Sequence, residues 1–426
     1  MRIQRLLLVL ILVLFLFGCA TPAETPPADD AAPETPSTAI PAATDAPTET
    51  AAPTETPTEI PTATPTLVPT PVGADPNLCK LPGDFNVYLY ESDITLGFPV
   101  KPIRLVSTGT VRVAVLFVDF EDAAATVSPE DVFNMISPGA EEFFLATSYG
   151  QMQMELVPLL EWLRMPGSKD DYFMHSSVSH RDYIRQAAAL ADPDFDFSDI
   201  DDIVVMNDPA TSPFSYGPAF AADLSEGGIE VDGMTINNGA TSGTDLTYWG
   251  STWLNHEMGH NMGLVDLYLY GSSNALRWVG EWSVMGLIDG KGHEHFAWER
   301  WQLNWVIDAQ VACFPEGGTT TLTAVEVPGG VKLIVVPVGG TRAVVIESRR
   351  ALGYDSAIPE GGVLVYTVDT SIASGQGGLQ VQTSGVSADY LDAPLAAGES
   401  LRISGVTITV LESGETTDTV QVEFGP

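Results

Sequence analysis

The stretch that decides the fold is Thr252-Trp-Leu-Asn-His-Glu-Met-Gly-His-Asn-Met-Gly-Leu-Val-Asp266. Its histidines, His256 and His260, are four residues apart, and on a helix such residues lie on the same face. Both imidazoles can therefore reach one metal ion at the zinc–nitrogen distance of roughly 2.0–2.1 Å. Glu257 lies next to the first histidine, where its carboxylate can contact a water beside the metal instead of the metal itself. The stretch therefore predicts a zinc-binding helix.

The end of the same stretch predicts a third ligand. Gly263 allows the chain to leave the helix in a left-handed conformation. The turn would bring Asp266 back toward the two histidines as an anionic ligand. Three protein ligands leave one position open, which is typical of a catalytic zinc site and not of a structural one. The alternative is a capped helix with two core histidines, which would place two of the chain's six histidines at ligand spacing by chance.

The extended pattern resembles the metzincin signature, with Asp266 in the place of the third histidine. Trp282-Ser-Val-Met-Gly286 resembles the Met-turn of that group, in which a methionine, here Met285, packs beneath the metal ligands. A larger part of the chain, roughly residues 110–370, resembles the immune inhibitor A family of bacterial metallopeptidases. The segments that carry this resemblance are 111–120, 142–152, 256–268, 297–305, 347–350 and 361–369.

The resemblance implies an extracellular zinc endopeptidase that acts on proteins or peptides. One catalytic zinc ion would be held by His256, His260 and Asp266. Glu257 would be the general base, which takes a proton from the attacking water and delivers it to the leaving amine. Two alternatives stay open. The first is a catalytically weak surface binding protein on a peptidase fold, and the second is a zinc amidase that acts on cell-envelope substrates.

The chain departs from the family pattern in two ways. Where the family commonly carries a calcium-type Asp-x-Asn-x-Asp-Gly loop, residues 194–202 have no glycine and lead directly into a predicted strand. Ca²⁺ is therefore only a secondary expectation. Leu287 stands where some metzincins have a tyrosine, which leaves the partner of the developing oxyanion unassigned. His293 and His295 follow in a glycine-rich loop and are candidates for oxyanion or substrate contact, although loop histidines without a role are also common.

The N-terminal residues predict export and a lipid anchor. Residues 1–18 combine two basic residues with an apolar run too short to span a bilayer, which is typical of a signal peptide. The run ends in Leu16-Phe17-Gly18-Cys19, which resembles the lipobox of bacterial lipoproteins and implies that Cys19 is diacylated. The alternative is an ordinary secretory signal. Residues 19–76 are rich in Thr and Pro and lack Lys and Arg, which predicts a disordered tether at the extracytoplasmic face of the bacterial cell membrane.

Charge and cysteine content limit the classes of binding partner and indicate the redox compartment of the protein. The formal net charge is −38, and the tether contributes only nine of the negative charges, so the folded part is acidic as well. This excess argues against nucleic-acid binding. The expected partners are protein or peptide substrates and the membrane, and the expected state is a monomer. With Cys19 assigned to the lipid, Cys79 and Cys313 form an even pair in an oxidising compartment, which predicts a disulfide between them.

Hydrophobic periodicity predicts two folded domains. In residues 77–310, strand patterns alternate with helix patterns, as in an α/β domain. The strands are expected at 111–119, 152–160 and 203–206, and the helices after Ser128, at 141–146 and at 180–191. In residues 311–426, short alternating segments are separated by glycine-rich turns, at 319–327, 331–338, 343–348, 362–368 and 401–410. The predicted fold is an α/β (α+β) metzincin-like zinc peptidase domain followed by a small all-β, sandwich-like domain.

The lipid anchor gives a direct test. Replacing Cys19 by serine removes the sulfur to which the acyl chains would be attached. Because multiple acyl chains provide stable membrane attachment, we expect Cys19→Ser to move the protein from the membrane fraction to the soluble fraction. Cell fractionation with salt and carbonate washes measures this. A variant that stays on the membrane after those washes would contradict the lipoprotein interpretation.

Overall fold

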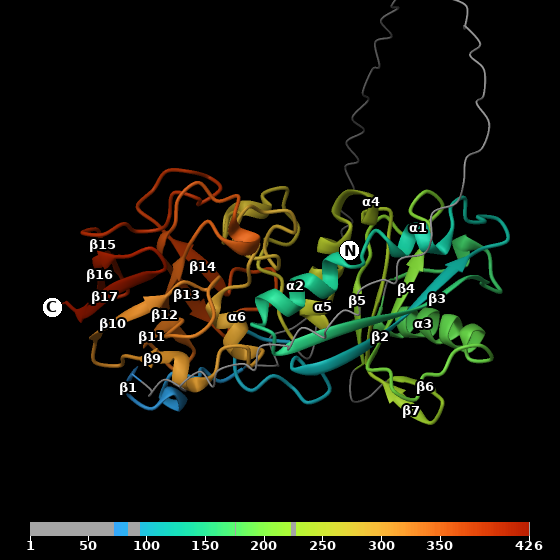
Figure 1. Cartoon of the computed structure of the whole chain (residues 1–426), viewed down its shortest axis with the longest axis horizontal. Coiled ribbons are helices and arrows are strands. Elements are labelled where there is room, and N and C mark those ends of the chain that lie inside the picture. Colours follow the sequence, from blue (N-terminus) through green and yellow to red (C-terminus); the bar gives the residue numbers. More distant parts are fainter. Residues whose placement is uncertain (1–71, 84–93, 175, 223–226, 426) are drawn as a thin grey trace, which may run out of the picture. The chain divides into compact units, whose positions relative to one another are not determined.

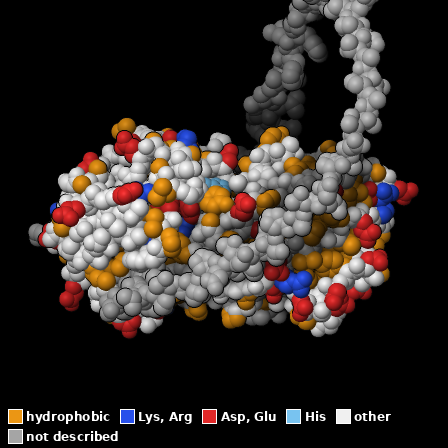
Figure 2. Space-filling view, viewed as in Figure 1, with side chains coloured by type: hydrophobic (Ala, Val, Ile, Leu, Met, Phe, Trp, Pro, Cys, Tyr) orange, Lys and Arg blue, Asp and Glu red, His pale blue; other side chains and the backbone are white. Residues whose placement is uncertain are grey.

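The computed structural model describes residues 72–83, 94–174, 176–222 and 227–425, which form a mixed α and β structure with several sheets and few helices (Figure 1). The predicted signal peptide, Cys19 and most of the predicted tether lie outside the described residues. None of the described helices is long and apolar enough to cross a membrane. Asp and Glu side chains are spread over the face shown in Figure 2, in keeping with the acidic composition.

A five-stranded sheet organises the part of the chain that leads up to the predicted zinc helix. Its strand order is β3-β2-β4-β8-β5, with every pair parallel except the antiparallel pair of β8 with β5 at one edge. The strands are β2 (Gly109–Asp119), β3 (Met152–Arg164), β4 (Asp202–Asn207), β5 (Ala219–Ala221) and β8 (Asn238–Thr241). A separate hairpin is formed by β6 (Ile229–Val231) and β7 (Met234–Ile236).

The sequence of the inner strand β2 explains why this sheet is buried on both faces. Successive side chains of a strand point to opposite faces. The odd-numbered residues 111–117 accordingly pack in one hydrophobic core, and the even-numbered residues 114–118 pack in a second. A run that is apolar at both parities is characteristic of a parallel sheet that is covered on both sides.

Helices cover the two faces of the sheet. The helix α3 (Ser177–Ala191) contributes Tyr183 and Ile184 to the second core. The helices α2 (Gly139–Thr147) and α5 (Ser251–Asn261) pack against each other and contribute to the first core. The other helices are α1 (Pro129–Phe133), α4 (Leu246–Trp249) and α6 (Ala297–Gln302), and the short 3-10 helices are η1 (Pro76–Leu78), η2 (Lys169–Asp171), η3 (Ala275–Arg277), η4 (Asp308–Gln310) and η5 (Gly353–Asp355).

Two further sheets lie in the C-terminal part and share a hydrophobic core of their own. The six-stranded sheet has the order β1-β9-β11-β12-β13-β14, and the four-stranded sheet has the order β10-β17-β16-β15. Their strands are β1 (Val72–Gly73), β9 (Val311–Cys313), β10 (Gly318–Thr323), β11 (Leu333–Pro337), β12 (Arg342–Arg349), β13 (Gly362–Asp369), β14 (Leu379–Gln382), β15 (Ser400–Ile403), β16 (Val406–Ser413) and β17 (Thr417–Phe424).

The six-stranded sheet also packs against the helical part of the molecule. Leu333, Val345 and Tyr366 on its other face belong to the same core as α2 and α5. All described residues fall in one compact unit. The sheet therefore connects the two predicted domains through a continuous core.

One predicted strand is divided in the structure. Residues 401–410 have a single alternating pattern, but they form the adjacent strands β15 and β16 of a hairpin. Ser404 and Gly405 take φ values of 51° and 81°, and two consecutive residues with positive φ make a tight hairpin turn.

The disulfide between Cys79 and Cys313 is present, with a Cα–Cα distance of 5.8 Å. The same end of the chain is also held by β1, which pairs with β9 in parallel. The bridge closes a loop with a sequence separation of 234 residues. In chain-entropy models a loop of this length stabilises the fold by about 5 kcal/mol.

We expect the double variant Cys79→Ser/Cys313→Ser to lose up to about 5 kcal/mol of unfolding free energy. Denaturant unfolding of wild type and variant measures the difference. Alkylation of the wild-type protein without reductant, followed by mass spectrometry, provides the control. Two freely alkylated thiols in that control would show that the bridge does not form.

Candidate metal centre

The helix α5 ends in the turn that the sequence predicts. Its last turn closes with hydrogen bonds from Gly263 N to His260 O (2.9 Å) and from Leu264 N to Gly259 O (2.9 Å). This is the Schellman pattern, which needs a left-handed residue after the helix. Gly263 supplies that residue, with φ of 103°. The chain therefore reverses directly after the second histidine and carries Asp266 back to the helix.

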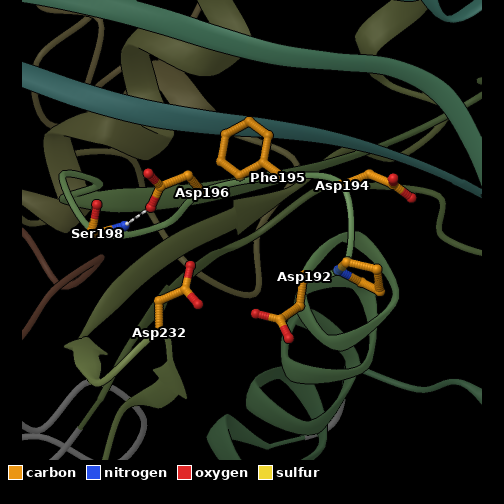
Figure 3. Close-up of a pocket in the computed structure, with 7 residues that line it drawn as sticks. Asp192, Asp194, Phe195, Asp196, Ser198 and Asp232 are labelled. Atoms are coloured by element: carbon orange, nitrogen blue, oxygen red, sulfur yellow. Dashed lines mark hydrogen bonds between the residues drawn. The ribbon is translucent and has the colours of Figure 1, made fainter.

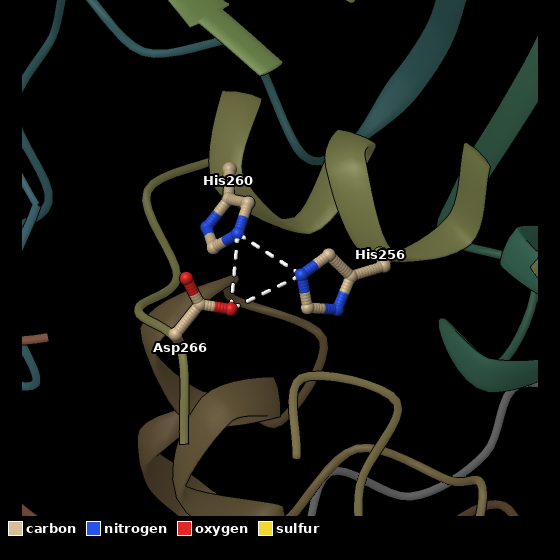
Figure 4. A group of neighbouring side chains, drawn as sticks. All are labelled: His256, His260 and Asp266. Atoms are coloured by element: carbon tan, nitrogen blue, oxygen red, sulfur yellow. Dashed lines mark hydrogen bonds and ion pairs between the residues drawn. The ribbon is translucent and has the colours of Figure 1, made fainter. Parts of the chain in front are cut away.

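The three predicted ligands come together (Figure 4). His256 Nε2 lies 3.1 Å from Asp266 Oδ1, and His260 Nε2 lies 3.4 Å from the same oxygen. The two Nε2 atoms are 3.2 Å apart. Around a tetrahedral zinc ion with bonds of roughly 2.0–2.1 Å, ligand atoms are separated by about 3.3–3.4 Å. The triangle of donor atoms therefore has the size that such an ion requires.

Hydrogen bonds to the backbone fix the tautomers of both histidines. His256 Nδ1 lies 2.8 Å from Val284 O, and His260 Nδ1 lies 2.9 Å from Leu264 O. A carbonyl oxygen only accepts, so each Nδ1 carries the hydrogen and each neutral ring presents the lone pair of Nε2 to the centre. This arrangement, with the outer nitrogen donating to a carbonyl, is the usual one for histidine ligands of metals.

The carboxylate of Asp266 lacks a hydrogen-bond donor on its inner side. Its Oδ1 is buried without a hydrogen-bond partner among the described residues, whereas its Oδ2 accepts from Tyr270 Oη at 2.5 Å. Burial opposes ionisation, but the nearby His260 and His256 hold the pKa of Asp266 below its ordinary value. Burial opposes protonation of His256, but Asp266 raises its pKa overall, so each group favours the charged form of the other. When both histidines are neutral, their hydrogens lie on Nδ1, and two nitrogen lone pairs and an anionic oxygen meet without a donor between them. These residues fit a divalent cation with a preference for nitrogen and oxygen ligands, such as Zn²⁺.

Glu257 is buried beside this group without being part of it. Its side chain comes from the same helix, one residue after His256, and only 7% of the residue is exposed. Burial raises the pKa of Glu257 to about 7, while the two histidines and a hydrogen bond from the backbone of Ala219 act to lower it. A carboxyl group with a pKa near neutrality can both take up and release a proton. The edge strand β5, which contains Ala219, was not identified from the sequence.

Met285 packs directly beneath the helix, as the resemblance to a Met-turn predicts. A Cβ atom added to Gly259 would lie 2.4 Å from Met285 Sδ, so the glycine between the two histidines allows this close approach. The backbone of Met285 also accepts a hydrogen bond from Leu267 N at 2.8 Å. The methionine therefore supports both the helix and the segment that carries Asp266.

The end of α5 is held from below by a buried polar pair. Asn261 Nδ2 donates to Asp202 Oδ2 at 2.7 Å and to Gly239 O at 3.0 Å. Both acceptors belong to the five-stranded sheet, in β4 and β8. Burial raises the pKa of Asp202 to about 8. The residue after His260 is thus anchored to the sheet.

The two loop histidines are buried. His293 is 7% exposed and His295 is fully buried, and their rings lie 5.4 Å and 5.5 Å from that of Phe143. Burial lowers the pKa of His293 to about 4 and that of His295 well below its ordinary value, so both rings are neutral at physiological pH. Their role in oxyanion stabilisation or substrate contact stays a prediction.

The acidic segment considered for Ca²⁺ lines a surface pocket (Figure 3). The pocket contains Asp192, Asp194, Asp196 and Asp232. Two of these carboxylates are engaged by backbone amides: Asp196 accepts from Ser198 N and Asp232 from Phe197 N. Among the described residues, these carboxylates do not form a metal-binding group of the kind found at His256, His260 and Asp266.

Comparisons with known proteins add no assignment, because no protein-family model matches the chain and no curated protein matches it.

The third ligand is testable by substitution. Asp266→Ala leaves only two histidines as ligands. Loss of a hydrogen bond to a metal ligand typically lowers metal affinity roughly 10–100-fold, and loss of the ligand itself should lower zinc affinity by more than this. Asp266→His should restore metal occupancy better than Asp266→Asn, because imidazole is a good zinc ligand. Chelator competition and elemental analysis measure both effects. Full zinc occupancy of Asp266→Ala would show that Asp266 is a loop residue and not a ligand.

Proposed function

We propose that this protein is a zinc-dependent endopeptidase, similar to the immune inhibitor A family, that is held at the extracytoplasmic face of the bacterial membrane by a lipid on Cys19. The observation that carries the proposal is the meeting of three donor atoms, His256 Nε2, His260 Nε2 and Asp266 Oδ1, at separations of 3.1–3.4 Å. Glu257 adds a buried carboxyl group beside them.

The chemistry divides between the metal and the protein. A zinc ion at this centre would supply Lewis acidity, which polarises a peptide carbonyl and makes a water acidic near neutral pH. Three protein ligands leave room for that water and for a substrate oxygen. The two Nδ1–H hydrogen bonds hold the imidazoles of His256 and His260 with Nε2 toward the centre, so their lone pairs are available without rearrangement.

Glu257 would perform the proton transfers. In its ionised form it accepts a proton from the attacking water, and in its protonated form it delivers that proton to the amine of the leaving peptide. Burial raises the pKa of Glu257 to about 7, and a cation beside it would favour the carboxylate. The group would therefore be ionised, as a base must be, at neutral pH.

The negative charge of Asp266 adjusts the acidity of the centre. An anionic ligand donates more charge than a third neutral imidazole, so an ion held here is expected to be a slightly weaker Lewis acid than one held by three histidines. The resemblance to the immune inhibitor A family implies that the substrates are proteins or peptides. The experiment below tests this function against two alternatives, a binding protein on a peptidase fold and a zinc amidase.

Glu257→Gln tests the proposal. Glutamine has nearly the same shape as glutamate, and Glu257 is not one of the ligands, so fold and zinc content should be retained. Loss of a general base typically costs about 10²–10⁴ in rate. Hydrolysis of an unstructured protein such as casein should therefore fall by that factor, while zinc content measured on the same sample stays constant.

The outcomes of this experiment separate the hypotheses. Equal cleavage by wild type and Glu257→Gln would show that Glu257 is not the base. A zinc-loaded wild type that cleaves no protein in a broad panel would favour the binding protein. Release of products from envelope amides, without cleavage of proteins, would favour the amidase.

A further inference from the structure

The loop between β13 and β14, residues 370–378, reaches the segment that carries Asp266. Both backbone groups of Asp266 are engaged by this loop. Its N–H donates to Ser374 Oγ at 3.0 Å, and its carbonyl oxygen accepts from Gly375 N at 2.9 Å. The two residues are more than a hundred positions away in the chain and belong to the six-stranded sheet region. The backbone position of Asp266 is thus set from outside its own segment.

The same loop holds Tyr270, whose hydroxyl group binds the outer oxygen of Asp266. Tyr270 N donates to Gly375 O at 3.0 Å. A Cβ atom added to Gly375 would lie 2.3 Å from the ring of Tyr270, and Gly375 has φ of 66°, so only glycine fits at this contact. The ring therefore lies directly on the loop backbone, and its hydroxyl group is directed at Asp266 Oδ2 at 2.5 Å.

The hydrogen bonds around Asp266 form a closed ring. Tyr270 Oη has one hydrogen, which it donates to Asp266 Oδ2, since a carboxylate only accepts. The contact of 3.1 Å between Tyr270 Oη and Ser374 Oγ must then be donated by the serine. Ser374 Oγ in turn accepts from Asp266 N. The Tyr270 hydroxyl, the Ser374 hydroxyl and the backbone N–H of Asp266 thus each donate one hydrogen bond within the ring. Ser374 is only 5% exposed.

We infer that Tyr270 and Ser374 are positioning residues for the third ligand, and that the β13–β14 loop completes the metal centre. The ring of hydrogen bonds occupies Oδ2 and leaves Oδ1 as the single oxygen directed at His256 Nε2 and His260 Nε2, at 3.1 Å and 3.4 Å. Asp266 is thus held with one carboxylate oxygen available as a ligand. The inference rests on the proposed function only to the extent that the centre binds a metal ion.

Ser374 lies in the part of the chain that the sequence placed in a separate β-rich domain, whereas Tyr270 lies in the predicted peptidase domain. The β-rich domain would supply part of the outer shell of the centre, in addition to packing against the helices. Outer-shell hydrogen bonds of this kind typically contribute 10–100-fold to metal affinity.

Tyr270→Phe in the full chain, purified in detergent, tests the inference. It removes one hydroxyl group and keeps the ring on the loop. We expect the zinc affinity, measured by chelator competition, to fall about 10–100-fold. The d–d absorption of the Co²⁺-substituted protein should change, because Asp266 becomes free to rotate. The melting temperature of the metal-free protein should stay close to that of wild type.

Two further variants make the result specific. Tyr390→Phe is the matched control, because it also removes a phenol hydrogen bond, to Arg277 O at 2.9 Å, away from Asp266. It should leave zinc affinity unchanged. Ser374→Ala should weaken zinc binding, and Tyr270→Phe/Ser374→Ala should cost less than the sum of the single changes, since both residues act in one ring.

The outcomes distinguish this inference from the proposed function. A zinc affinity of Tyr270→Phe equal to that of wild type would overturn the inference and leave the peptidase proposal intact. A wild type that binds zinc but cleaves no protein would overturn the peptidase proposal, whereas weaker zinc binding by Tyr270→Phe would still support the inference. A wild type without measurable zinc affinity would overturn both.

Discussion

The centre of the molecule is governed by an electrostatic constraint: a buried carboxylate oxygen faces two imidazole nitrogens whose other nitrogens already donate to carbonyls. Asp266 Oδ1 lies within 3.4 Å of both Nε2 atoms, and none of the three has a hydrogen to offer while the histidines are neutral. Lone pairs that converge in a desolvated site repel one another and favour a cation between them. The Schellman turn after α5, the close contact of Met285 with Gly259 and the loop that holds Asp266 all keep these atoms together.

The groups that orient His256, His260 and Asp266 come from parts of the chain that are far apart in sequence. Each is a backbone atom or a side chain of a different segment. Val284 O precedes Met285, Leu264 O follows the helix, and Ser374 lies beyond β13. The segment next to His293 is attached to the six-stranded sheet by a buried ionic group, in which Arg349 pairs with Asp355 and Glu347, and Arg300 pairs with Glu294. Removal of one member of a buried pair typically costs about 3–5 kcal/mol. The β-rich part therefore stabilises the frame of the centre as well as its own core.

The sequence predicts those features that depend on local patterns. Three such features can each be recognised from a few consecutive residues: the spacing of His256 and His260, the left-handed position of Gly263, and the apolar run of β2. The disulfide follows from simple pairing, since only two cysteines stay available once Cys19 is assigned to a lipid. Features that depend on distant partners could not be predicted. Tyr270 and Ser374 carry no pattern that links them to Asp266, the three-residue edge strand β5 is too short to show a period, and the turn at Ser404 is hidden because serine rarely takes positive φ.

The distribution of these contacts bears on how the centre and the fold are coupled. If only α5 and its turn determined the candidate site, the binding of a metal there would be a local event and the β-rich part would be dispensable for it. Instead, Asp266 is held at its backbone nitrogen and its backbone oxygen by groups of the 370–378 loop. Its outer carboxylate oxygen is held by Tyr270, which packs on that loop. A rigid outer shell means that the donor atoms are prepared before an ion arrives, so less binding free energy is spent on ordering them. Conversely, any ion that binds only the folded chain stabilises every element that contributes to the shell. If a metal ion binds at this centre, its binding and the docking of the six-stranded sheet should therefore be thermodynamically linked, because Asp266 is held between two parts of the chain.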